Sequence, residues 1–347
     1  MLGTIRIKSS NLKPVKLTKV GYRQIKITKD LENVMNAIKL FKGRKNLKIL
    51  IDKKDPRFLK GQLMPDGKCM GARITVLPNG KQINKAYSLF AKNLTIHDET
   101  SNEHWDVMFL NPGGTSSYVY TVEKNIKHNK QKYKKVELFQ KHYIQIKRKV
   151  KIALNNKDDY VALPMYTLLK TYMRIGNETY YKANGHKGLT TLKKDDIKIN
   201  GNTIEFTYLS KGGVPRKITQ EFPPNYVKRL TKKLKPLKKS SFVFTNSEGK
   251  TLKDRHFMKA FKKYCGKEFY PHIVRSHFAT SKAKEFLKKH KKTDKIEINA
   301  FFSSIAQKLG HKKFDKKNKV WKESHNITIN YYIAPETVKS IKKLVEN

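Results

Sequence analysis

The spacing of apolar residues changes along the chain, and this change restricts the possible folds more than any other feature. Residues 1–123 alternate short apolar runs with turn signals, which is typical of strands joined by tight turns. Beyond residue 135 the apolar residues recur every three or four positions, which is typical of helices. We therefore expect an α+β protein with a β-rich N-terminal domain, 1–123, and a mostly helical second domain, 136–347.

The first domain contains turn dipeptides with short apolar runs around them. Asp66-Gly67 and Asn79-Gly80 each suit the two-residue turn of a hairpin. Residues 98–106 gather carboxylates and a histidine, and we interpret them as an acidic loop rather than a metal site, because no further ligand lies nearby.

The segment between the two domains is strongly basic. KNIKHNKQKYKK, residues 124–135, contains six lysines in twelve residues and no apolar periodicity. We expect a basic linker here, because nothing in the pattern defines a face that could pack on a core.

The second domain should combine helices with a small sheet. Apolar residues spaced four, three and four apart define one helix face: Val161, Met165, Leu168 and Tyr172. Residues 197–218 instead alternate around an Asn200-Gly201 turn and turn again at 210–213, so we expect a three-stranded sheet there. Lys211 should lie at the tip of the second hairpin.

The charge of the chain indicates its partner. The sequence has 76 Lys and Arg against 28 Asp and Glu, a net charge of +48. Such an excess is self-repulsive unless a polyanion binds, so we expect a nucleic-acid partner, here duplex DNA. No run approaches the length and hydropathy of a membrane span, and two isolated cysteines suit a reducing compartment. We therefore expect a soluble intracellular protein. The second domain has no converging cluster of Asp and Glu, and no Walker-type nucleotide-binding motif occurs, so we also expect no metal and no cofactor.

Two adjacent tyrosines near residue 330 raise the question of a phenol nucleophile. A tyrosine hydroxyl has a pKa near 10 and needs help to attack a phosphodiester. Negative charge then builds on the phosphate oxygens, and the departing sugar oxygen needs a proton. Fixed cations stabilise this charge, and a general acid supplies the proton. The second domain carries such groups in this order: Arg174 before a glycine, Lys211 at a hairpin tip, His272 and Arg275 three residues apart, His311 after a helix end, and Tyr331 and Tyr332.

Five short motifs in this order resemble a known family. RIGNETY, GLTTL, the hairpin lysine, KLGH and YYIAP look like the corresponding motifs of type IB DNA topoisomerases. The resemblance covers roughly residues 139–347 and is greatest to the compact enzymes of poxviruses, other large DNA viruses and some bacteria. The family belongs to the same superfamily as the tyrosine recombinases.

The resemblance assigns a role to each matching residue. The family's first and second arginines, which hold the phosphate, match Arg174 and Arg275. Its hairpin lysine, the general acid, matches Lys211. The histidine that follows Leu-Gly matches His311, and the nucleophile, which precedes an Ile and a Pro, matches Tyr332.

Two other histidines remain candidates for a phosphate contact. In the compact enzymes the LGH-like motif lies close to the tyrosine, whereas here a basic insertion separates His311 from Tyr332 and supplies His325. We prefer His311, because it follows the motif. His272, with Arg275, resembles the H-x-x-R box of the recombinases, and this histidine is a possible further donor.

The family resemblance implies a complete reaction cycle. A monomer would close around duplex DNA as a C-shaped clamp and form a 3′-phosphotyrosyl link, and the strand would then swivel and be resealed, without ATP, metal or other cofactor. The protein would act with DNA inside the cell, in a nucleus, or in a viral factory or virion if it is viral. Two alternatives stay open: a tyrosine recombinase with the same chemistry, and a non-catalytic architectural DNA-binding protein.

Overall fold

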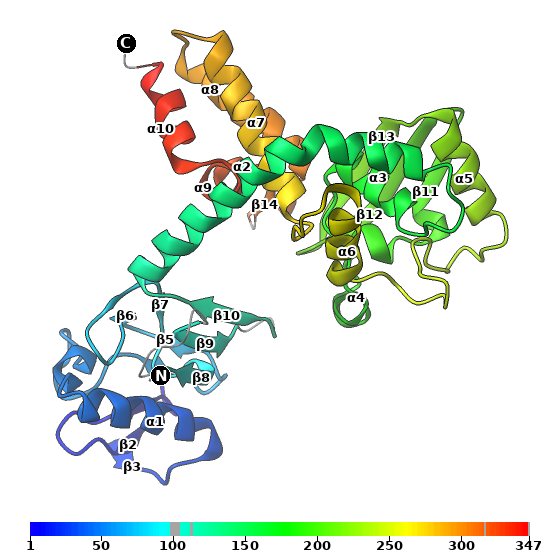
Figure 1. Cartoon of the computed structure of the whole chain (residues 1–347). Coiled ribbons are helices and arrows are strands. Elements are labelled where there is room, and N and C mark those ends of the chain that lie inside the picture. Colours follow the sequence, from blue (N-terminus) through cyan, green and yellow to red (C-terminus); the bar gives the residue numbers. More distant parts are fainter. Residues whose placement is uncertain (98–104, 112–113, 316, 346–347) are drawn as a thin grey trace. The chain divides into compact units, whose positions relative to one another are not determined.

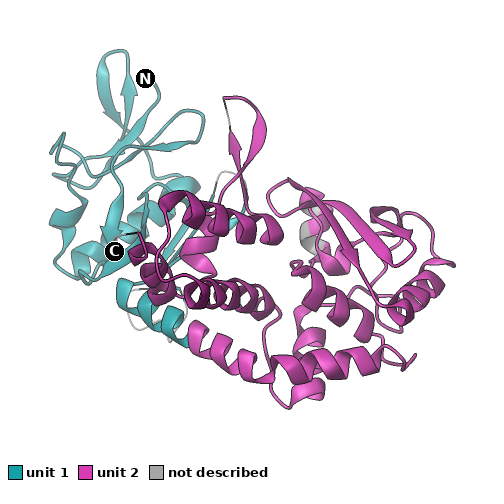
Figure 2. Cartoon of the chain, turned by 90° about the horizontal axis from the view of Figure 1, so that it is seen from above, with its two compact units in different colours: residues 1–131 teal, residues 132–347 magenta. Residues whose placement is uncertain are grey.

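The computed structural model describes residues 1–97, 105–111, 114–315 and 317–345. The chain divides into two compact units, 1–131 and 132–347, which Figure 2 colours separately. Of the acidic segment 98–106, residues 98–104 lie outside the described part, so its interpretation as a loop stays a prediction. The units are described one at a time below (Figure 1).

The first unit consists of small antiparallel sheets and one helix. A five-stranded sheet has the order β3-β2-β1-β4-β5, a three-stranded sheet the order β10-β9-β8, and β6 pairs with β7. The strands are β1 Ile5–Ile7, β2 Pro14–Thr18, β3 Gly21–Gln24, β4 Gln62–Leu63, β5 Cys69–Met70, β6 Ile74–Val76, β7 Gln82–Tyr87, β8 Lys92–Ile96, β9 Val107–Leu110 and β10 Ser116–Val119.

Both predicted hairpin turns of this unit are confirmed. Gly67 and Gly80 have φ angles of 77° and 85°, which L side chains rarely adopt, and they join β4 to β5 and β6 to β7. The sequence interpretation missed helix α1, Lys29–Gly43, whose buried residues lie on one face. These are Leu31, Val34, Ala37, Ile38 and Phe41. The spacing of this face is helical and was visible in the sequence.

The segment 124–135, which we interpreted as a linker, is helical. It forms the first part of α2, Val122–Ala153, a helix of 32 residues, and the division between the units falls within it. Lysine is a favourable helix former. The apolar face that is missing from 124–135 begins immediately afterwards, with Val136 and Phe139 buried in the core of the second unit. The helix is thus packed on the core from Val136 onward and extends N-terminally through residues that have little apolar periodicity of their own.

The second unit is mostly helical, as predicted. After α2 its elements are α3 Ala162–Thr171, α4 Glu178–Asn184, 3-10 turns Leu189–Thr191 and Lys194–Asp196, β11 Ile197–Asn200, β12 Thr203–Ser210, β13 Val214–Glu221, α5 Pro224–Leu234, α6 Asp254–Cys265, α7 Ile273–Lys289, α8 Lys295–Leu309, β14 Lys312–Asp315, β15 Val320–Glu323, α9 Asn326–Tyr331 and α10 Pro335–Lys343. The α+β fold class is confirmed.

Specific sequence predictions hold in this unit. The three-stranded sheet β11-β12-β13 is antiparallel, and Lys211 lies in the turn that joins β12 to β13, where Ser210 pairs with Val214. The helix predicted around Met165 is α3. The basic insertion after His311 forms a hairpin, β14–β15.

Two buried clusters form the core of the second unit. The larger one packs α2, α3, α5 and α6 against the three-stranded sheet. The smaller one joins α7, α8 and α10 and includes Tyr332 and Ile333. The tyrosine predicted as nucleophile is therefore anchored in a helical core rather than in a surface loop.

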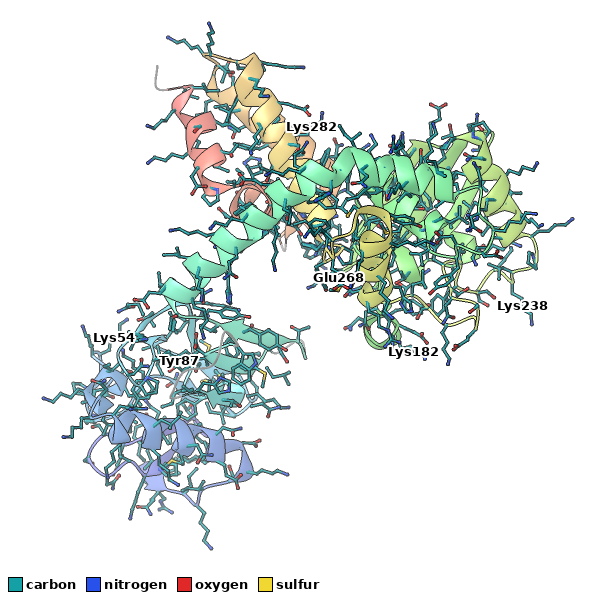
Figure 3. The ribbon with its side chains drawn as sticks, viewed as in Figure 1. Lys54, Tyr87, Lys182, Lys238, Glu268 and Lys282 are labelled. Atoms are coloured by element: carbon teal, nitrogen blue, oxygen red, sulfur yellow. The ribbon has the colours of Figure 1, made fainter. Side chains whose placement is uncertain are left out.

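Lysines cover the surface of both units. Lys54, Lys182, Lys238 and Lys282 are all exposed (Figure 3). Within the described residues, no three His, Cys, Asp or Glu side chains are grouped so as to hold a metal ion. No helix among them is long and apolar enough to cross a membrane.

Candidate active site

The two adjacent tyrosines point in different directions. Tyr332 is 3% exposed, whereas Tyr331 is 64% exposed. Helix α9 ends at Tyr331, and Tyr332 follows it with φ −124° and ψ −23°. Consecutive residues near a helix end project about 100° apart, so only one of the two rings can enter the core.

Arg174 contacts the hydroxyl of Tyr332 directly. Its Nη2 donates to the Oη of Tyr332 at 2.9 Å. Helix α3 ends at Thr171, and the next residue, Tyr172, takes the left-handed conformation (φ 56°) and turns the chain just before Arg174. The arginine predicted from the RIGNETY motif is thus placed against the tyrosine predicted from YYIAP.

The glycines of the first two motifs allow the backbone around Arg174 to pack closely. The amide of Leu189 donates to the carbonyl of Arg174 at 2.8 Å. A Cβ on Gly188 would lie 2.7 Å from that carbonyl oxygen, and one on Gly176 would lie 2.3 Å from the Oγ1 of Thr191. Glycine is required at both positions because any side chain would push the GLTTL segment away from the arginine.

Arg275 lies on the first turn of α7 and is 2% exposed. Its Nη2 donates to the carbonyl of Leu309 at 2.8 Å and to the Nε2 of His311 at 3.1 Å, and its Nη1 donates to the carbonyl of Tyr172. Its Cζ is 5.3 Å from the centroid of the Tyr332 ring. Burial lowers the pKa of Arg275 to about 10.

The Nε of Arg275 is buried and has no hydrogen-bond partner among the described residues. A buried donor without a partner costs about 1–3 kcal/mol. Such groups are rare in folded proteins, and a binding site for an anionic oxygen is one explanation. The remaining donors of the guanidinium hold it in a fixed orientation beside the tyrosine.

His311 follows α8 and is buried beside Tyr332, with the two ring centroids 4.7 Å apart. Its Nδ1 is 2.8 Å from the Oγ1 of Thr328, and its Nε2 is the atom that faces Arg275. Since Arg275 can only donate, Nε2 accepts and Nδ1 carries the proton. Burial, and then the charge of Arg275, lower the pKa of His311 to about 2.

Arg216 of β13 holds the end of α8 in place, and the sequence interpretation missed it. Its guanidinium donates to the carbonyls of Gln307 and Lys308 at 3.0 Å and 3.1 Å. It packs flat over Gly310, where a Cβ would lie 2.3 Å from Cζ, and Gly310 itself has a φ of 72°. Arg216 and Gly310 together determine where the chain leaves α8 and so where His311 lies.

Lys211 is exposed and touches neither the tyrosine nor the arginines. It lines a cavity of about 410 Å³ together with Arg174, Arg275 and His311. The hairpin β14–β15 contributes Trp321 to the same cavity. Lys211 thus lines the cavity from a hairpin tip, on a flexible side chain of four carbons.

The structure separates the two remaining histidine candidates. His272 lies near Tyr332, with ring centroids 5.3 Å apart, and lines a second cavity of about 250 Å³ with Arg174 and Lys211. Burial, and then the charges of Arg275 and Arg174, lower its pKa to about 3. His325 instead precedes α9, with its Nδ1 3.1 Å from the Oγ of Ser303, and lines neither cavity.

The geometry brings four of the five main candidates into direct or near contact. Arg174, Arg275 and His311 surround the Tyr332 ring, and Lys211 lines the same cavity. A group of this kind can bind a phosphate diester through its nonbridging oxygens and stabilise the charge that develops on them.

Comparison with known proteins identifies the family of the chain. Residues 122–344 match the family described as the catalytic core of eukaryotic DNA topoisomerase I. A DNA topoisomerase 1B of Acanthamoeba polyphaga mimivirus is 26% identical over 170 residues, which cover 45% of this chain and 50% of that protein. The chain thus matches about half the length of this relative.

Two solved structures of a site-specific recombinase, XerH, bound to its difH substrate are also similar. The post-cleavage complex is 17% identical, with a TM-score of 0.34 over 57% of this chain and 51% of that chain. The pre-cleavage complex is 17% identical, with a TM-score of 0.31 over 49% and 50%. The family match, by contrast, spans most of the chain and includes every candidate residue from Arg174 to Tyr332. The resemblance noted from the short motifs is therefore confirmed, and the chain belongs to the family of the eukaryotic DNA topoisomerase I catalytic core.

Proposed function

We propose that this protein is a type IB topoisomerase that relaxes supercoiled duplex DNA through a covalent bond to Tyr332. The observation that carries the proposal is the contact of 2.9 Å between Arg174 and the hydroxyl of Tyr332. It puts a permanent cation on the oxygen that would attack, and Arg275, which is buried, lies next to the same ring. The net charge of +48 and the exposed lysines support DNA as the partner.

The chemical step joins the Oη of Tyr332 to phosphorus and breaks the bond from phosphorus to the 5′ oxygen. The phenolic proton passes to solvent, and the ammonium group of Lys211 gives a proton to the departing 5′ oxygen. Arg174 and Arg275 hold the nonbridging oxygens and stabilise their growing charge. The products are a 3′-phosphotyrosyl bond and a free 5′-hydroxyl.

His311 has a defined place in this scheme. In the DNA-free protein its Nε2 accepts from Arg275, so this atom is the unprotonated one. A bound phosphate would compete for the donors of Arg275 and release Nε2. The negative charge of the phosphate would then favour a proton on Nε2, which could donate to a phosphate oxygen. His272, whose ring centroid lies 5.3 Å from that of Tyr332, could donate to a phosphate oxygen in the same way.

Relaxation of supercoils follows from the same bond. The free 5′ end rotates about the intact strand, supercoils of either sign relax, and the 5′-hydroxyl attacks the phosphotyrosine to reseal the DNA. The phosphodiester energy is conserved in the covalent intermediate. We therefore expect that the cycle needs neither ATP nor a metal ion, and that a monomer carries it out.

Relaxation of a supercoiled plasmid in EDTA, without ATP, tests the proposal. We expect full relaxation, and an absolute requirement for a divalent ion would contradict the cationic mechanism. A covalent adduct without relaxation would favour the recombinase alternative. DNA binding without any adduct would favour a non-catalytic architectural protein.

A further inference from the structure

The backbone that carries Tyr332 is held by side chains from two other helices. The carbonyls of three consecutive residues, 331–333, each accept a hydrogen bond from a side chain. Lys132 of α2 donates to the first, Thr280 of α7 to the second at 3.1 Å, and Tyr133 of α2 to the third at 2.7 Å. We call these three donors the carbonyl clamp.

The clamp supplies what the local secondary structure lacks. Helix α9 has only six residues, and a helix this short has little stability of its own. The last carbonyls of any helix have no partner within it. The clamp satisfies the last carbonyl of α9, that of Tyr331, and the two carbonyls that follow it. It thereby fixes the direction in which the chain leaves α9, and so the direction of the Tyr332 side chain.

Both α2 donors are partly buried, which shifts the pKa of each. Burial, and then the nearby carboxylate of Glu336, raise the pKa of Tyr133 to about 12, so its hydroxyl keeps its proton and donates. Burial lowers the pKa of Lys132 to about 8, and its ammonium group lies 5.7 Å from the centroid of the Tyr332 ring. Lys132 is thus near the phenol as well as bonded to its backbone.

We propose that Lys132 and Tyr133 are positioning residues for the nucleophile, which fix Tyr332 for in-line attack by holding the carbonyls before and after it. The proposal rests on the proposed function. Attack on phosphorus requires the oxygen in line with the leaving group, and a misplacement of about 1 Å can cost roughly 100-fold in rate. The hydrogen bonds of both residues go to the backbone on either side of Tyr332, whereas its hydroxyl is bonded to Arg174, so we assign both a role through the backbone.

Two substitutions with matched controls test the proposal. Lys132→Met removes the ammonium group and keeps the length of the side chain, and Lys134→Met removes the same charge from an exposed position two residues further along α2. Tyr133→Phe removes one hydroxyl, and Tyr160→Phe removes one from a residue that is 40% exposed. The measurements are the single-turnover rate of adduct formation and the Kd for DNA.

We expect Lys132→Met and Tyr133→Phe each to slow adduct formation by about 10- to 100-fold. Both controls should keep the wild-type rate. Lys132→Met and Lys134→Met should have the same Kd, since each loses one cation. Lys132→Arg, which can still donate to the carbonyl, should recover most of the rate. Wild-type rates in both clamp variants, or equal losses in variants and controls, would overturn the proposal.

Hydrogen exchange of the DNA-free protein separates this proposal from the proposed function. Loss of a clamp donor should increase amide exchange within 330–336 in Lys132→Met and Tyr133→Phe but not in the controls, whether or not the protein cleaves DNA. Unchanged exchange in both clamp variants would overturn the positioning role. A wild-type protein that forms no adduct would instead overturn the proposed function.

Discussion

Replacing Gly310 by alanine should destabilise the second unit by an amount that depends on Arg216. Gly310 has a φ of 72°, and a Cβ there would lie 2.3 Å from the Cζ of Arg216. The left-handed conformation costs a non-glycine residue about 1–2 kcal/mol. Arg216 can move away, but it then loses its two hydrogen bonds to the end of α8, at about 0.5–1.5 kcal/mol each. The sum is a loss of about 2–5 kcal/mol in the free energy of unfolding.

A double-mutant cycle isolates the contribution of Arg216. In an Arg216→Ala background the clash and the hydrogen bonds are already gone, so Gly310→Ala should cost only the backbone strain of about 1–2 kcal/mol. Urea unfolding followed by circular dichroism measures all four proteins. Equal costs of Gly310→Ala in both backgrounds would refute the idea that Arg216 and Gly310 act as one unit. The single Gly310→Ala variant should also form the adduct more slowly, because His311 follows the displaced residue.

Three further predictions concern the acid, the DNA contact and the pH dependence of stability. Lys211→Ala should slow cleavage by about 10²- to 10⁴-fold with little effect on Kd, and a substrate with a 5′-bridging sulfur, whose thiolate leaves without a proton, should restore the rate; a failure of this rescue would mean that Lys211 is not the acid. The Kd for DNA should rise by about 10³-fold or more when the salt concentration is raised about fourfold, if six or more phosphates are contacted, and a flat dependence would contradict the phosphate-backbone account. The free energy of unfolding should fall as the pH is lowered from 6.5 to 5. Burial holds the pKa values of His272, His311 and His277, a buried residue of α7, at about 3, 2 and 4, whereas the unfolded chain takes up these protons near pH 6.5. Each histidine contributes at most ~1.4 kcal/mol per pH unit to this loss of stability. Equal free energies of unfolding at pH 6.5 and pH 5, measured by urea unfolding, would contradict the burial of these rings.

The candidate cluster could be predicted because its residues lie in short motifs with a strong local cause. Arg174 is followed by a segment in which only glycine fits, and Tyr332 precedes an isoleucine that enters the core and a proline that begins α10. Such constraints act over a few residues, so they are visible in the sequence. The hairpin tip at Lys211 was predictable for the same reason.

The residues that support the cluster could not be predicted in this way. Arg216 is one of 76 basic residues, and its role appears only when β13 lies beside the end of α8. Lys132 and Tyr133 lie about 200 positions before the carbonyls that they hold. Their segment has no apolar periodicity of its own. Its helical conformation therefore depends on the packed residues that follow it. Contacts over such distances are properties of the tertiary structure.

The location of the covalent bond tests the central claim most directly. The protein is incubated with a DNA substrate that traps the cleaved strand, denatured and digested, and the DNA-linked peptide is identified by mass spectrometry. We predict a link to Tyr332, with no adduct in Tyr332→Phe and a normal adduct in Tyr331→Phe, because the first ring is buried beside Arg174 and the second is exposed. An adduct on Tyr331, or an adduct that persists in Tyr332→Phe, would contradict the account.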